Sequence, residues 1–448
     1  MLNQAKKRLL SPTVQLTRKL CTLSSLFPTP PTPSPTKEKN LTKSQAESSL
    51  FRSLAAINQN KNGGRIDEVL NEWISNEGKS CNKNDIVRSV YRLCSFKKFD
   101  HALQLLEWTE KRGLIVLTCR EHAKSIDLIR KARGWEAAEK YFLDLPESAK
   151  KKSTYGALLQ CYCCEKLTDK AMALFEKMQA LNFPINTYDY CSLMNLRINL
   201  GEPEKVPLLE QEMKAKGIEP HVFVYKLLIN AYSSLKDIKQ VERVEEEVKI
   251  RSGFTPDWGF YSCLAAVYME AGLVEKAELN LKEIEKQMRF DHRAYHSLLN
   301  MYAKLGKAEE VDRIWESLKS AFPRTTNLSY LTRLHALLRL EDMDEIKRCY
   351  EEWESSFTHY DVRLANVLIK SYIKQDMIEE AKAGLDQILE KGYEPNFVTY
   401  AQFVDYFMEN NEKDLARKYL ELGTPHVRSH EQVVYEKVKE RVLSIVGK

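Results

Sequence analysis

A repeat of about 35 residues runs through most of this 448-residue chain and restricts its fold more than any other feature. Segments such as VYKLLINAY (224–232) and AYHSLLNMY (294–302) share an aromatic position, two variable residues and two apolar residues. We use the residue directly after the aromatic position as the marker of each repeat. The eight markers, which lie 34 to 36 residues apart, are Gly156, Cys191, Lys226, Ser262, His296, Leu331, Asn366 and Ala401.

Each repeat is predicted to form two helices. A short turn such as KLGKAEE (304–310) follows the first helix, and the second has apolar residues three and four positions apart, as in AMALFEKM (171–178). Signals such as KGIEPH (216–221) end the second helix, because Gly closes it and Pro prevents its continuation. One helix pair cannot bury its apolar faces alone. The sequence therefore predicts an all-α fold, a right-handed superhelical α-solenoid of 35-residue helix-turn-helix repeats.

The remaining segments complete the predicted organisation. Weaker helix-pair repeats are expected over 46–151, the eight clear repeats over 152–431, and a capping helix over 432–448. A linker rich in Pro and Thr is expected over 28–45, since PTPPTPSPT favours extended backbone.

The first 27 residues have the composition of an organelle transit peptide. They contain no Asp or Glu, and their basic residues alternate with apolar ones, with Ser and Thr abundant. We expect import into a mitochondrion, with a plastid as the alternative. No apolar run approaches the roughly 18 residues of a membrane span, so no membrane partner is expected. The ten cysteines are scattered, which indicates a reducing compartment.

The charge of the chain is unevenly distributed. Residues 1–37 hold six of the 68 Lys and Arg and none of the 63 acidic residues, which leaves the rest of the chain near neutral. A nucleic-acid partner would therefore have to be bound by a local basic stripe.

The repeat resembles the plain type of pentatricopeptide repeat, a family especially numerous in land plants. The resemblance rests on PHVFVYKLLINAY (220–232), AYHSLLNMYAKLGKAEEVDRIW (294–315) and EPNFVTYAQFV (394–404). The tetratricopeptide class, with its 34-residue period, fits less well. The resemblance implies binding of single-stranded organellar RNA, one base per repeat. It also implies that the marker residue reads each base together with the last residue of the same repeat.

Transferred to this sequence, the scheme gives seven pairs of candidate base-reading residues. Ser262 with Asp291 and Asn366 with Asn396 are the two readable combinations, whereas Leu331 cannot hydrogen-bond a base. The other pairs are Gly156 with Asn186, Lys226 with Asp257, Cys191 with His221, His296 with Thr326 and Leu331 with Asp361. Phe223, Trp258 and Val398, at the starts of first helices, are candidates for stacking on bases.

The position eight residues after the marker often holds a phosphate-facing Lys in this family. Here it is basic in three consecutive repeats, as Lys304, Arg339 and Lys374. We expect RNA phosphates along this stripe, with Arg333, Arg363 and Lys370 reinforcing it. The alternative is that the stripe is an ordinary solvated surface.

The sequence does not indicate catalysis. HEQVV (430–434) has Val434 where a zinc-protease helix needs a second His, and the C-x-x-C spacing of Cys161 and Cys164 falls inside one predicted helix. No enzyme, metal or cofactor is expected. The sequence favours an organellar RNA-binding adaptor that acts in RNA processing, stability or translation, with RNA-processing proteins as further partners. The alternative is a structural component of an organellar ribosome that binds protein or rRNA.

Overall fold

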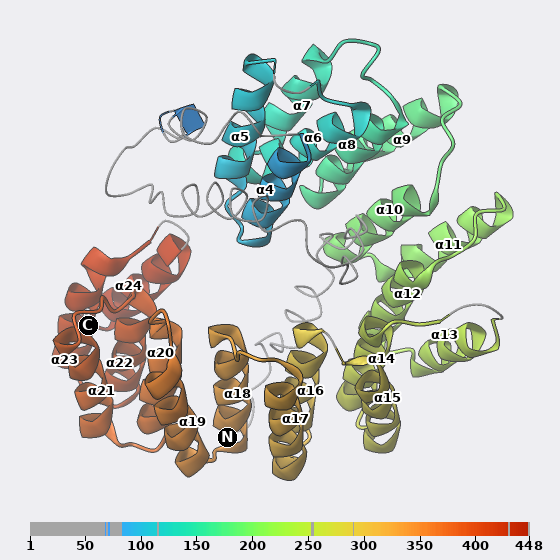
Figure 1. The fold of residues 1–448 in the computed structure, drawn as a ribbon. Coiled ribbons are helices and arrows are strands. Elements are labelled where there is room, and N and C mark those ends of the chain that lie inside the picture. The colour runs from blue at the N-terminus through green and yellow to red at the C-terminus, as the bar shows by residue number, and fades with distance from the viewer. Residues whose placement is uncertain are drawn as a thin grey trace, which may run out of the picture. The chain divides into compact units, whose positions relative to one another are not determined.

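The computed structural model describes residues 68, 70–71, 83–113, 116–251, 255–289, 291–428 and 431–446. The predicted transit peptide and linker, and most of 46–82, lie outside these residues. Among the described residues, every regular element is a helix. The predicted all-α fold of stacked helix pairs is confirmed (Figure 1). The chain divides into two compact units, with the boundary between Arg251 and Ser252.

Unit 1 consists of helix pairs, and several of its first helices pack on the first helix of the next repeat. Contacts run from α6 to α8, from α8 to α10 and from α10 to α12. The helices are α4 (Lys83–Ser95), α5 (Phe99–Lys111), α6 (Cys119–Arg133), α7 (Trp135–Asp144), α8 (Lys152–Cys164), α9 (Thr168–Ala180), α10 (Thr187–Leu200), α11 (Val206–Ala215), α12 (Val222–Ser234) and α13 (Ile238–Ile250). A short 3-10 helix, η3 (Pro203–Lys205), precedes α11.

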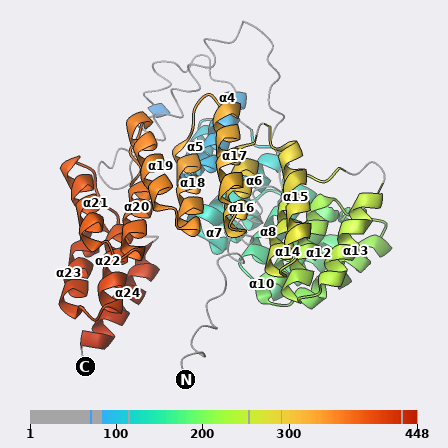
Figure 2. The same ribbon diagram turned by 90° about the horizontal axis from the view of Figure 1, so that it is seen from below.

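Unit 2 continues the same pattern, and Figure 2 shows its helices from a second direction. The first helices α14, α16, α18, α20 and α22 contact one another in succession. The elements are α14 (Trp258–Glu270), α15 (Val274–Gln287), α16 (His292–Lys304), α17 (Ala308–Ala321), α18 (Asn327–Leu340), α19 (Met343–Ser356), α20 (Val362–Lys374), α21 (Ile378–Glu390), α22 (Phe397–Glu409), α23 (Lys413–Gly423), η4 (Thr424–His426) and α24 (Gln432–Val446). Helix α24 packs on α22 and α23 and buries Val438 and Val442.

The aromatic position of the repeat is a structural anchor. Tyr190, Tyr225 and Tyr330 bury their rings in the core. Each donates its hydroxyl to a glutamate 22 residues later, on the second helix of the same repeat, at 2.9 to 3.0 Å. A tyrosine suits this position because it supplies apolar area and a polar tip that finds a partner. The aromatic period in the sequence thus reflects the joint between the two helices of a repeat.

A left-handed residue ends each first helix of the eight repeats. It lies ten residues after the marker, and its φ is between 58° and 78°. The eight residues are Lys166, Gly201, Lys236, Gly272, Gly306, Glu341, Asp376 and Asn411. At Gly306 the next N–H, that of Lys307, bonds the carbonyl of Tyr302 at 3.0 Å, as in a Schellman cap. Only three of these residues are glycines, so five repeats accept some backbone strain.

Candidate nucleic-acid interface

The acidic side chains of α16 to α21, the central repeats of unit 2, all lie on the second helices. Helices α17, α19 and α21, the second helices, carry 13 Asp or Glu and five Lys or Arg. The first helices α16, α18 and α20 carry no acidic residue at all. Their seven basic residues are Arg293, Lys304, Arg333, Arg339, Arg363, Lys370 and Lys374. A face with basic and no acidic residues is the kind of local feature that nucleic-acid binding requires where the rest of a chain is near neutral.

The three predicted phosphate contacts occupy equivalent positions. Lys304, Arg339 and Lys374 each lie in the last turn of their helix. Arg339 and Lys374 are exposed and Lys304 is half-buried. Burial lowers the pKa of Lys304, and the positive charge of Arg339 on the neighbouring first helix lowers it further. An anion bound near both groups would raise this pKa again.

Acidic groups partly offset the stripe at its two ends. Glu270, in the last turn of α14, attracts Lys304 and raises its pKa somewhat. The ammonium of Lys374 lies 3.8 Å from the carboxylate of Glu341, and both side chains are well exposed. An exposed pair at this distance contributes little and can be exchanged for a phosphate.

A histidine that sequence reasoning missed belongs to the same basic surface. His335 lies one turn before Arg339 on α18 and is exposed at its surface. Partial removal of its ring from water lowers its pKa, and the charges of Lys370, Arg339 and Arg363 lower it further, in that order. The signal in the sequence was its position, because His335 and Lys370 both lie four residues after their markers. Helical spacing places that position on the face of the marker.

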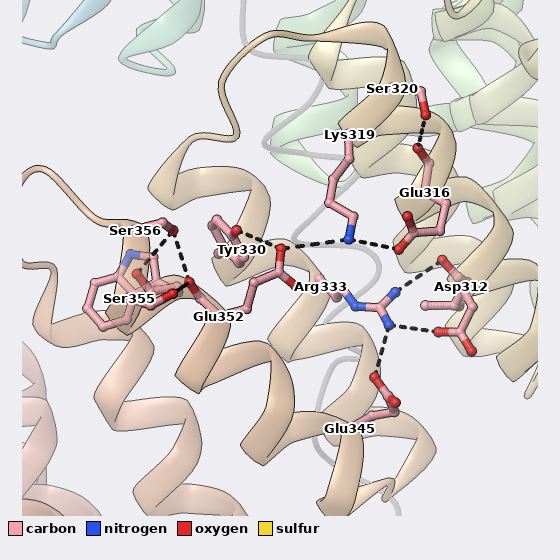
Figure 3. A network of polar contacts seen from close by, with 12 residues as sticks. Asp312, Glu316, Lys319, Ser320, Tyr330, Arg333, Glu345, Glu352, Ser355 and Ser356 are labelled. Atoms are coloured by element: carbon pink, nitrogen blue, oxygen red, sulfur yellow. Dashed lines mark hydrogen bonds and ion pairs between the residues drawn. The ribbon is translucent and has the colours of Figure 1, made fainter.

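The prediction that Arg333 reinforces the stripe was wrong. Its side chain is buried and donates to Asp312 at 2.8 Å and to Glu345 at 3.3 Å (Figure 3). Its guanidinium carbon also lies 5.2 Å from the ring centre of Trp315. The physical reason is the helical angle, since a residue two positions after the marker lies about 200° around the helix from it. Arg333 holds α18 against α17 and α19.

Arg363 is exposed but is already engaged by an anion. Its Nε donates to Asp361 at 2.9 Å, and a second nitrogen of the guanidinium bonds the same carboxylate. Asp361 also accepts the backbone N–H of Arg363 as the N-cap of α20. This local pair reduces the net charge that Arg363 adds to the stripe.

The predicted base-reading residues at the repeat ends are helix N-caps. Asn186, Asp257, Asp291 and Asn396 precede α10, α14, α16 and α22, and each side chain accepts a backbone N–H of its helix. Asp, Asn, Ser and Thr are the preferred N-caps of helices in general. The polar residue that closes each repeat therefore has a structural role that does not depend on RNA.

The structure joins one of the two readable pairs and not the other. Asn366 donates its side-chain amide to the side-chain oxygen of Asn396 at 3.0 Å, and both residues are buried. Ser262 instead shares a hydrogen bond of 2.8 Å with Ser297 of the next first helix. Asp291 accepts from the indole N–H of Trp258 at 3.1 Å and from Arg293.

Two of the five other candidate pairs, Gly156 with Asn186 and Lys226 with Asp257, offer little for base reading. A side chain at Gly156 would meet the ammonium of Lys152 and the carboxylate of Asp189, each at 3.5 Å. These two groups form an ion pair at 2.7 Å, and Asp189 is almost fully buried. Lys226 belongs to unit 1, where it is half-buried, and Asp257 belongs to unit 2, where it caps α14.

The three stacking candidates do not share one position. Phe223 and Val398 lie two residues after their N-caps, and Val398 is 41% exposed. Trp258 lies only one residue after its N-cap, and Gly259 holds the equivalent place. The spacing between the markers Lys226 and Ser262 is 36 residues, so counting 35 residues from Phe223 reaches the wrong position. Trp258 is instead fixed by its bond to Asp291.

The cysteines near the first marker lie in α8, and burial raises the pKa of Cys161 to about 12. A thiol in that state is a poor metal ligand at neutral pH. Within the described ranges, no group of three or more His, Cys, Asp or Glu is arranged to hold a metal ion. No described helix is long and apolar enough to cross a membrane.

Stacked helix pairs define this protein as an α-helical repeat protein. Residues 153–183, 293–321 and 364–393 match the family described as "PPR repeat". Residues 173–233 and 208–271 match the "Pentatricopeptide repeat domain".

Two relatives from Arabidopsis thaliana cover most of the chain. Pentatricopeptide repeat-containing protein At4g01990, mitochondrial, is 40% identical over 381 residues, which are 85% of this chain and 75% of the relative. Large ribosomal subunit protein mL101 (rPPR4) is 37% identical over 383 residues, 85% of this chain and 76% of the relative. The chain belongs to the pentatricopeptide repeat family. The predicted mitochondrial location is confirmed by relatives that are named as mitochondrial proteins, At4g01990 among them.

A solved structure agrees on the fold. The crystal structure of the pentatricopeptide repeat protein PPR10 in complex with an 18-nt psaJ RNA element superposes with a TM-score of 0.50 at 17% identity. The match covers 90% of this chain and 62% of that chain. At this level of identity the likeness shows that the two proteins share a fold.

Proposed function

We propose that this chain is a mitochondrial RNA-binding adaptor that holds single-stranded RNA against the first helices of its repeats. It acts in RNA processing, stability or translation and has no catalytic activity of its own. The observation that carries the proposal is the charge pattern of unit 2, where α16, α18 and α20 hold seven basic residues and no acidic one. Of these seven basic residues, Arg333 is buried and the other six are not.

Phosphate contacts explain how such a surface binds RNA. Lys304, Arg339 and Lys374 recur once per repeat, so they form a row across neighbouring helices. A strand that follows this row releases counterions at each contact, which supplies affinity that does not depend on sequence. The charge of Arg339 lowers the pKa of Lys304 in the free protein, and a phosphate bound near both groups would offset that effect.

A second candidate function is a structural role in the mitochondrial ribosome. The likeness to large ribosomal subunit protein mL101 favours it, because that relative aligns over 85% of this chain. In that setting the first-helix face would contact rRNA of fixed shape, or a protein, instead of a free strand.

A pull-down from mitochondria separates the two functions. The tagged full chain is purified, its bound RNA is sequenced, and its complexes are sized before and after RNase treatment. Enrichment of one or a few transcripts, with complexes that shrink on RNase treatment, supports the adaptor. Stoichiometric ribosomal proteins with uniform rRNA coverage would support the ribosomal role and contradict the adaptor.

A further inference from the structure

We infer that the repeats of unit 2 recognise the ribose-phosphate backbone of RNA and do not select its base sequence. This inference rests on the proposed function, because it describes how the same surface binds. It departs from the one-base-per-repeat scheme that the family resemblance implies. The inference rests on the markers of four consecutive repeats, Ser262, His296, Leu331 and Asn366. In each of them a different feature prevents the side chain from reading a base.

The first of these four markers, Ser262, is hydrogen-bonded to the next repeat. Its hydroxyl shares a hydrogen bond with the hydroxyl of Ser297 at 2.8 Å, and both side chains are buried. Ser297 also lies 3.9 Å from the sulfur of Met301. A base edge would have to break a buried hydrogen bond between two helices to reach Ser262. The net gain of such an exchange is small, because one hydrogen bond replaces another.

The second marker, His296, is likewise bonded to the following first helix. Its Nε2 lies 2.9 Å from the hydroxyl of Ser329, which is itself 3.0 Å from the hydroxyl of Thr326. Burial and the neighbouring His292 lower the pKa of His296 to about 4, so the ring is neutral. A neutral ring with one nitrogen engaged has a single nitrogen left for any other partner. It cannot form the two-bond contact that distinguishes one base from another.

The third and fourth markers complete the set. Leu331 is 8% exposed and has no hydrogen-bonding group. Asn366 uses both ends of its amide, since it donates to Asn396 at 3.0 Å and accepts from the hydroxyl of Thr399 at 2.7 Å. Asn396 also caps α22 through the backbone N–H of Thr399. Reading a base here would disturb a bonded group of three buried side chains.

The backbone-binding groups, in contrast, remain at the surface. Arg339, Lys370 and Lys374 are exposed, on helices that hold no acidic residue. A good bidentate base contact supplies about 1–3 kcal/mol of discrimination, and none of the four markers is placed to make one. Phosphates and riboses are the same in every sequence. Unit 2 therefore contributes affinity without base preference.

The remaining markers do not restore base reading elsewhere in the eight repeats. Gly156 and Ala401 have no polar side chain, and Cys191 is fully buried. Lys226, half-buried on α12, carries a charge that suits a phosphate as well as a base. The inference can therefore be tested on the full chain.

The test compares affinities for unstructured RNAs of equal length and different sequence. Fluorescence anisotropy of the full chain at one fixed salt concentration is measured with oligo-U, oligo-A, oligo-C and two mixed sequences. We expect dissociation constants within about threefold of one another, because the phosphate contacts are common to all. Replacing Ser262 and Asn366 by Ala together should leave the ratios between RNAs unchanged. Replacing Lys304, Arg339 and Lys374 by Ala should weaken all RNAs by the same factor.

Three results would overturn the inference, and they can be told apart. Binding of one sequence about 30-fold or more tighter than the others would refute base-independent recognition and leave the proposed function standing. Absence of binding to any RNA, by a chain whose helical circular dichroism is intact, would refute both. A sequence preference that disappears in the Ser262→Ala and Asn366→Ala double variant would show that these two markers do read bases.

Discussion

The side chain of Asn366 donates a hydrogen bond to the side-chain oxygen of Asn396 at 3.0 Å and so joins α20 to the start of α22. Thr399 completes the group, since its hydroxyl donates to Asn366 and its backbone N–H donates to Asn396. A pair that has the residue types of a base-reading site is thus a joint between two consecutive repeats. The same bonds fix the helix start and stabilise the contact between neighbours.

This joint predicts an unequal response to two substitutions. Asn396→Ala removes the N-cap of α22 and the acceptor of the buried Asn366 amide. We expect a loss of about 1–3 kcal/mol in the free energy of unfolding, measured by urea titration followed by circular dichroism. Asn396→Asp keeps both acceptor functions and should cost less than about half as much. Equal losses for the two variants would show that the joint is not held by these hydrogen bonds.

The left-handed turns predict stabilisation by a glycine. Glu341 has a φ of 59°, which costs a residue with a Cβ about 1 kcal/mol relative to glycine. Glu341→Gly should therefore stabilise unit 2 by up to about 1 kcal/mol in thermal or urea unfolding. Gly306, with a φ of 72° at the equivalent position, supplies the reciprocal test.

A methyl group at Gly306 would meet no atom within 4 Å, so Gly306→Ala changes only the backbone preference. It should destabilise the chain by about 1 kcal/mol. If both variants shift stability in the same direction, conformational strain is not the cause.

Arg333 is predicted to matter for stability and not for RNA. Its buried guanidinium donates to Asp312 and Glu345, and removing it leaves these carboxylates without their cation. Because Asp312 is 53% exposed and Glu345 24% exposed, water will solvate them in part, and we expect Arg333→Ala to cost about 2 kcal/mol. The affinity for RNA, measured below the unfolding transition, should stay within about twofold. A loss of affinity equal to that of Arg339→Ala would return Arg333 to the phosphate stripe.

His335 predicts a pH dependence of RNA binding. In the free protein its pKa is lowered by burial and by Lys370, Arg339 and Arg363, while Asp361 partly neutralises Arg363. A phosphate bound among these cations would raise the pKa of His335, so the complex would bind more protons than the free chain. Affinity should then increase as the pH falls from about 7.5 towards 5.5, through the range in which histidine titrates.

Comparison with His335→Gln isolates this contribution, because His292 and His296 are present in both proteins. The variant should lose a substantial part of the pH dependence, which amounts to at most about tenfold in affinity per unit of pKa change. Identical pH profiles of RNA affinity for the two proteins would show that His335 does not contact the bound strand.

The sequence was sufficient to predict the repeat fold because each repeat carries its own structural signals. The aromatic position places a tyrosine in the core, as Tyr190 and Tyr330 show, and the turn ten residues after the marker takes a left-handed residue in every one of the eight repeats. These interactions are local or lie within one helix pair. Both partners of each interaction therefore belong to the same 35-residue repeat, and the repeat pattern in the sequence is enough to predict them.

Whether the marker side chains are available to RNA depends on contacts between repeats, which the 35-residue period does not determine. The bonds of Ser262 to Ser297 and of His296 to Ser329 join side chains of neighbouring first helices, and their formation depends on rotamers and burial. The orientation of Arg333 could have been predicted from the sequence, since a residue two positions after the marker lies on the opposite side of the helix. The register of Trp258 was missed because one repeat is a residue longer than the others.

The salt dependence of RNA affinity tests the central claim most directly. The claim is that Lys304, Arg339 and Lys374 bind phosphates, and the measurement is the slope of log affinity against log salt concentration for a single-stranded RNA. Replacing all three by Ala should make the slope shallower by about two, at about 0.7 for each lost contact. The matched control replaces two lysines and one arginine of the second helices, Lys282, Lys382 and Arg348, by Ala and removes the same net charge. The account predicts that the control keeps the wild-type slope. Equal slopes for the two triple variants would contradict a phosphate-binding face on the first helices.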